Sequence, residues 1–103
     1  MAASSRRKGL SGEREVARIW QRAGFEVRGL EGLGDHVVVC GNGLTLHSEV
    51  KRAERLKMPE WVRQVDAEAP PGTVPLLQWR QNRGVWRADL PLSELVTLLG
   101  VYQ

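Results

Sequence analysis

Apolar residues recur at helical spacing near the start of the chain. Between positions 11 and 23 they follow one another at steps of three and four residues: Val16, Ile19, Trp20 and Ala23. Such a stripe is typical of a helix that lies against a core, and Gly24 behind it is a common helix end. The same criteria predict a helix over 58–69, with Pro59 in its first turn, and a short third helix over 93–100.

Between these helices, alternating or continuous apolar runs predict five strands. They are expected at 25–28, 35–40, 44–51, 73–80 and 85–90. Gly41-Asn42-Gly43 separates the second run from the third, and Gln-Asn-Arg-Gly at 81–84 separates the fourth from the fifth, so two hairpins are expected. Pro75 indicates that the fourth strand has one unpaired side there or starts late. This order of elements predicts an α/β fold, a mixed central β-sheet flanked by helices.

Composition narrows the class of protein. With 103 residues, 42% apolar and 26% charged, the chain is expected to fold as one small domain, for which dimerisation would add burial. No apolar run reaches the roughly 18 residues of a membrane span. The first residues lack the apolar segment of a secretory signal, and the single Cys40 fits a reducing compartment. We therefore expect a cytoplasmic protein with a flexible basic arm over 1–10 and a single domain over 11–103.

The net charge is only +3, but the basic residues are grouped. Three clusters occur: Arg6, Arg7 and Lys8; Lys51, Arg52, Arg55 and Lys57; Arg80, Arg83 and Arg87. Such clusters suit phosphate contacts, although solvated surface charge explains any one of them equally well. A further row occurs at four-residue steps in the first helix: Arg14, Arg18 and Arg22. Like charges at this spacing cost helix stability, so the row either meets phosphates or is offset by Glu15 and Glu26.

Glu49 and Lys51 are predicted to share one face of the third strand, because side chains alternate along a strand. If Gly41–Gly43 form a three-residue loop, Asp35 stands opposite Glu49, with the Cβ atoms about 5 Å apart. A two-residue loop would shift this pairing by one position. Facing carboxylates repel each other unless a cation lies between them, and Mg²⁺ prefers such ligands. Lys51 adds a donor that can orient a metal-bound water or stabilise charge on a phosphate.

The first helix offers a third acid. Glu13 lies about 50° from the centre of the apolar stripe and can face the sheet, whereas Glu15, at about 110°, is expected to pair outward with Arg18. Each acid alone has a plain structural explanation, and only their convergence favours a site. His47 shares the face of Glu49 but is expected mainly to pack. The tryptophans are expected in the core, unless one serves as a dimer contact or base-stacking platform: Trp61, Trp79 and Trp86.

Asp35, followed after thirteen residues by Glu49-Val50-Lys51, resembles the signature of the PD-(D/E)xK nucleases. Together with "RKGLSGERE" at 7–15 and "GF.V" at 24–27, it is similar to the archaeal-type Holliday junction resolvases over about residues 6–51. Two departures occur, since Gly34 stands where proline is expected and the loop before Asp35 has no serine. The resemblance implies a restriction-endonuclease-like core and a Mg²⁺-dependent endonuclease, with Mn²⁺ able to substitute, that cuts four-way DNA junctions as a homodimer in recombination and repair.

Carried over position by position, the resemblance puts Glu13, Asp35 and Glu49 in the metal site and Lys51 beside the attacking water. The candidates for DNA binding are basic residues of the motif and of the cluster around Lys51: Arg6, Arg7, Lys8, Arg14, Arg52, Arg55 and Lys57. No membrane and no small-molecule cofactor are expected. Two alternatives stay open, namely another endonuclease of the superfamily that acts on flaps or without structural preference, and a non-catalytic basic DNA-binding protein.

Overall fold

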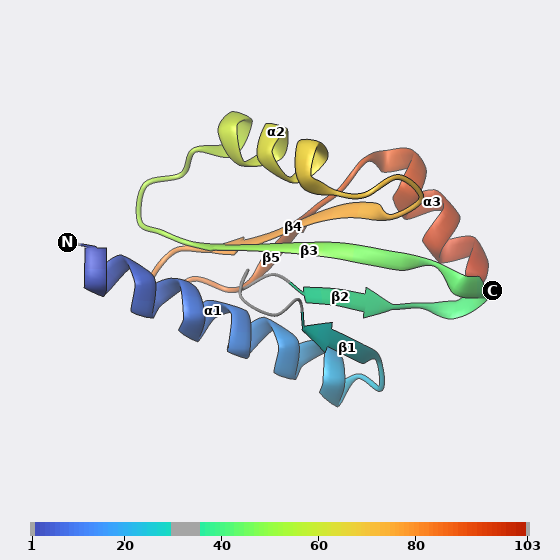
Figure 1. Ribbon diagram of the computed structural model, residues 1–103, viewed down its shortest axis with the longest axis horizontal. Coiled ribbons are helices and arrows are strands. Elements are labelled where there is room, and N and C mark those ends of the chain that lie inside the picture. Colours follow the sequence, from blue (N-terminus) through green and yellow to red (C-terminus); the bar gives the residue numbers. More distant parts are fainter. Residues whose placement is uncertain (1, 30–35, 103) are drawn as a thin grey trace.

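The structure, a computed structural model, describes residues 2–29 and 36–102, with side chains from residue 11 onward (Figure 1). The elements in chain order are α1 (Ala2–Arg22), β1 (Glu26–Gly29), β2 (His36–Val39), β3 (Thr45–Arg52), α2 (Met58–Glu68), β4 (Val74–Arg80), β5 (Arg87–Asp89) and α3 (Leu92–Val101). The strands form one sheet in the order β1-β2-β3-β4-β5, in which only the β3–β4 pair is parallel among the described strands. The predicted α/β class is confirmed, and the arrangement is compatible with a restriction-endonuclease-like core.

The sheet has helices on both faces, with α1 against one face and α2 against the other (Figure 1). On the α1 side, Trp20 and Phe25 pack against buried residues of three strands: Val38, Leu46, Val74 and Leu76. On the α2 side, Trp61 and Val65 pack against Leu77, which is fully buried. Burial on both faces explains why β4 reads as a nearly continuous apolar run. No helix in the described part of the chain combines the length and the apolar character that crossing a membrane requires.

The β2–β3 turn fixes the register of the central strands. Gly41–Gly43 form a three-residue turn in which Asn42 has φ 58° and Gly43 has φ 74°, a left-handed conformation that these residue types tolerate. The resulting pairs include His36 with Ser48. The predicted three-residue loop is therefore confirmed, and so is the register as far as residue 36. Asp35 itself lies outside the described residues.

The parallel β3–β4 pair is joined through α2, as a parallel connection requires a crossover. Pro75 lies in β4 at a position where β5 does not yet pair, because β5 contacts only Leu77–Trp79. The missing N–H of this proline therefore leaves no bond of the β4–β5 ladder unmade. The predicted unpaired side is confirmed.

Helix α1 differs from the prediction in its start and in its phase. It begins at Ala2 rather than Ser11, so residues 2–10 of the expected arm are helical; alanine, arginine and lysine favour this continuation. The row facing the sheet consists of Gly12, Val16 and Trp20, whereas Ile19 is 51% exposed. A Cβ on Gly12 would lie 3.2 Å from Trp86 Cη2, so this glycine allows the close approach that sets the phase.

A buried polar chain links α1 to the two central strands. Trp20 Nε1 donates to Gln78 Oε1, and Gln78 Nε2 donates to Ser48 Oγ. Ser48 and Gln78 are closed from solvent. Without these two hydrogen bonds, the polar atoms would lose their hydration and gain no partner. The hydrogen bonds therefore constrain how α1 packs on the sheet.

We expect Gln78→Leu to lower the free energy of unfolding by about 1–3 kcal/mol, because it leaves the indole N–H of Trp20 and the hydroxyl of Ser48 without their partner. Urea denaturation measures the change. Gln21→Leu, at an exposed position of the same helix, serves as the matched control and is expected to shift stability by less than about 0.5 kcal/mol. Equal stability of Gln78→Leu and wild type would contradict the structural role of the hydrogen bonds made by Gln78.

Candidate functional site

The acid and the lysine of the predicted motif lie side by side on the central strand β3. Glu49 is 6% exposed, and its Oε1 is 3.6 Å from Lys51 Nζ. Val50 and Arg52, which alternate with them, contact the α1 side through Gly12. Glu49 and Lys51 therefore share the face that α2 covers, as the alternation predicts.

The burial of Glu49 distinguishes this pair from ordinary surface charges. A carboxylate withdrawn from water loses hydration that a neighbouring cation must replace. Lys51 supplies one such charge from a side chain that keeps 26% of its surface exposed. The pair thus presents a desolvated carboxylate and an accessible ammonium at one place, which is the chemistry that binding a cation and a phosphate together requires.

Within the described residues, the side chains that come close enough to share a metal ion are His47, Glu49 and Glu68. One ligand atom from each lies within 4.8 Å of the others. His47 and Glu49 are buried on β3, and Glu68 is the exposed last residue of α2, where Gln64 Nε2 donates to it at 3.2 Å. Ligands of one ion at about 2.1 Å lie up to about 4.2 Å apart, so a small closure completes the set.

This donor set fits a divalent cation. Carboxylate oxygens suit Mg²⁺ and Mn²⁺, and an imidazole extends the choice toward Mn²⁺ and zinc. Neither His47 nor Glu68 was in the predicted metal set. The signal for His47 is visible in the sequence, since it lies two residues from Glu49 on the same strand face. Glu68 has no such local signal, because α2 brings it back over the sheet.

The other predicted metal ligands are placed differently. Glu13 is half-buried on α1, which packs on the opposite face of the sheet from Glu49. Glu13 is not in the group of described side chains that could share an ion with Glu49, and its place at the metal stays a prediction. Asp35 lies outside the described residues, but it is bonded to His36, and His36 pairs with Ser48 directly beside Glu49.

His36 is buried on β2, on the face of the sheet opposite to His47 and Glu49. Burial lowers the pKa of His36, and the nearby His47 lowers it further. His36 is therefore mainly neutral at pH 7 and adds no positive charge to the neighbourhood of the carboxylates.

The predicted DNA-binding residues fall into three groups. The side chains of Arg6, Arg7 and Lys8 lie outside the described part. Exposed basic side chains occur on α1 and in the segment after β3: Arg14, Arg55 and Lys57. Arg52 faces α1 instead, with Nη1 4.0 Å from Glu15 Oε1, so part of its charge is already offset within the protein.

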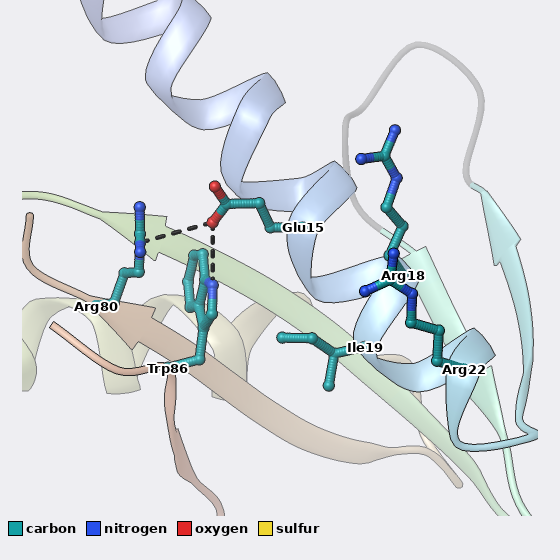
Figure 2. A pocket seen from close by; sticks show the side chains of 6 residues that line it. All are labelled: Glu15, Arg18, Ile19, Arg22, Arg80 and Trp86. Carbon is teal, nitrogen blue, oxygen red and sulfur yellow. Dashed lines mark hydrogen bonds and ion pairs between the residues drawn. The ribbon is translucent and has the colours of Figure 1, made fainter. Parts of the chain in front are cut away.

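Glu15 does not pair outward with Arg18, and that prediction is wrong. Its carboxylate accepts from Trp86 Nε1 at 3.0 Å and lies 3.6 Å from Arg80 Nε (Figure 2). The reason is the phase of α1, because a row through Gly12 and Val16 turns Glu15 toward β4 and the segment before β5. The apolar stripe predicted for this helix included Ile19, which is exposed, and this error in phase made Glu15 an outward-facing residue in the prediction.

Comparison with protein-family models and with curated proteins gave no match for this chain.

Proposed function

We propose that this protein is a Mg²⁺-dependent DNA endonuclease that resolves four-way junctions by paired nicks as a homodimer. The observation that carries the proposal is the buried Glu49 beside Lys51 on the central strand of a mixed α/β sheet. The register of β2 against β3 adds support, since it pairs the residue after Asp35 with the residue before Glu49. Motif spacing and fold are thus mutually consistent.

Glu49 would hold the ion together with Asp35, and His47 and Glu68, which lie near Glu49, would take the place predicted for Glu13, since α1 carries Glu13 on the opposite face of the sheet. When bound, the ion supplies a water of lowered pKa and positive charge beside the scissile phosphate. Lys51 holds the carboxylate of Glu49 in position, orients the attacking water and offsets negative charge that develops on the phosphate.

Substrate binding is proposed to rest on phosphate contacts. Arg55 and Lys57 are exposed and follow Lys51 within six residues, so they lie near the end of the strand that carries the site. Contacts of this kind respond to the shape and charge of DNA rather than to base sequence, and they weaken steeply with salt.

Helix α3 is the proposed dimer surface. Its exposed apolar residues recur at three- and four-residue steps: Leu92, Leu95, Val96 and Leu99. Glu94 is the one charged residue within α3. A second copy is the occupant that fits, because two symmetric incisions need two sites related by a two-fold axis.

The proposal is tested by incubating the purified protein with a synthetic four-way junction, a linear duplex and a flap, each in Mg²⁺ and in EDTA. We expect symmetric paired nicks in the junction with Mg²⁺, slower or no cutting of the other substrates, and no cutting in EDTA. Equal cutting of all three would make the protein a non-selective endonuclease. Tight junction binding without Mg²⁺-dependent cutting would replace the enzyme with a DNA-binding protein.

A further inference from the structure

An open pocket of about 290 Å³ lies on the α1 side of the sheet, the face opposite to Glu49. It lies between α1, the end of β4 and the segment before β5, and its lining residues are Glu15, Arg18, Ile19, Arg22, Arg80 and Trp86 (Figure 2). Three guanidinium groups and one carboxylate make it net positive. The function proposed above does not use this pocket.

One wall of the pocket is a closed charge cluster. Glu15 contacts both Arg80 and Trp86, and the guanidinium of Arg80 lies 5.5 Å from the centre of the Trp86 ring. Arg80 is therefore offset by a carboxylate and held against an aromatic face. The cluster fixes the shape of the wall rather than offering free charge.

The opposite wall carries two guanidinium groups that form no ion pair with any described carboxylate. Arg18 and Arg22 are exposed, and within the described residues neither has a carboxylate partner. The acids that might have balanced them are engaged elsewhere, because Glu15 pairs with Arg80 and Glu26 pairs with Arg28 at 3.0 Å. Of the two explanations that the sequence left open for this row, the intramolecular offset is therefore wrong.

The spacing of the row matches a polymeric anion better than a single small one. Arg14, Arg18 and Arg22 follow one another at four-residue steps, which is about 6 Å of helix rise per step. Every second phosphate of one duplex strand is about 6.8 Å further along the axis, which is close to the spacing of the arginines. Ile19, 51% exposed, gives the pocket an apolar floor beside these charges, suited to a sugar.

We propose that Arg18 and Arg22, extended by Arg14, bind the phosphodiester backbone of a DNA arm on the face of the sheet opposite to Glu49, with Ile19 and Trp86 packing against the sugars. This inference rests on the proposed function in taking DNA as the partner. It adds a second DNA-contact surface, so a junction arm can be held at α1 while another strand lies at the Glu49 face.

The test is the salt dependence of junction binding, measured by fluorescence anisotropy in EDTA. For Arg18→Gln/Arg22→Gln we expect the slope of log K against log salt to become shallower by about 1.8, since two phosphate contacts at about 0.9 each are lost. The matched control is Arg28→Gln/Arg63→Gln, which removes the same charge from exposed positions outside the pocket and is expected to keep the wild-type slope. All four positions are exposed, so the melting temperature should not change.

An unchanged slope in Arg18→Gln/Arg22→Gln, or an equal loss in the control, would overturn the inference, as would a wild-type protein that does not bind junction DNA. Because EDTA prevents cleavage, the result is independent of the metal site. A protein that binds DNA through Arg18 and Arg22 but never cuts it would contradict only the nuclease proposal. If the Arg18→Gln/Arg22→Gln variant cuts junctions normally and keeps the wild-type salt slope, only the second DNA-contact surface is contradicted.

Discussion

Glu49→Gln is expected to lower the rate of Mg²⁺-dependent junction cleavage by at least about a thousandfold, and Lys51→Met by about a hundred- to a thousandfold. The carboxylate is the buried group of the candidate site, and its neutral isostere has nearly the same volume but much weaker affinity for a divalent cation. Lys51 has Nζ 3.6 Å from that carboxylate, so its loss removes both the charge and the partner that holds Glu49. Single-turnover cleavage under saturating protein isolates the chemical step from binding.

The control for these variants is Glu60→Gln, an exposed acid in the first turn of α2, which removes the same charge from the helix that covers the site. Its cleavage rate is expected to equal that of wild type. Junction binding in EDTA should be nearly the same for all variants, which separates a loss of chemistry from a loss of affinity. Cleavage by Glu49→Gln at the wild-type rate would exclude this carboxylate from the reaction, and with it the proposed mechanism.

Val96→Glu/Leu99→Glu is expected to convert the protein from a dimer to a monomer, raising the dissociation constant of the dimer at least about a hundredfold. Each of these side chains is 60% or more exposed in the single chain, and covering one is worth about 1.5–3 kcal/mol. The introduced carboxylates would also face each other across a two-fold axis. Sedimentation velocity over a concentration series measures the change.

Thr97→Glu provides the comparison, because Thr97 is exposed on the other side of α3 and the substitution adds the same kind of charge. It should leave the dimer intact. Monomeric Val96→Glu/Leu99→Glu is further expected to nick one strand at a time, so paired incision is lost while single nicks persist. A wild-type protein that sediments as a monomer at every concentration would remove the proposed role of α3.

Local patterns predicted the elements well, because the signals that set them are local. Gly-Asn-Gly predicted a hairpin turn of two or three residues, and the three-residue turn found there gives the register that was predicted for it. The shared face of Glu49 and Lys51 followed from strand alternation. These features need only neighbours in sequence, and the structure agrees with them.

Features that depend on how elements meet were harder to predict. Trp79 and Trp86 were both expected in the core, from the two strands predicted on either side of residues 81–84. Instead, Trp79 packs with the α2 cluster, and Trp86 lies before β5 against the α1 side. Glu15 was turned outward because Gly12 was not recognised as the contact that sets the phase of α1. Glu68 reaches the site only through the α2 crossover, for which a single sequence carries no spacing signal.

The two outermost strands of the sheet, β1 with four residues and β5 with three, are short and carry charged side chains. Long, flat, apolar sheet borders invite other chains to add a strand and so seed aggregation, and short charged ones resist it. In the proposed dimer, these strand ends would direct self-association away from open-ended stacking of sheets and toward helix α3. A two-fold contact between α3 helices would close after two copies, so it would leave no apolar surface for further copies to add to.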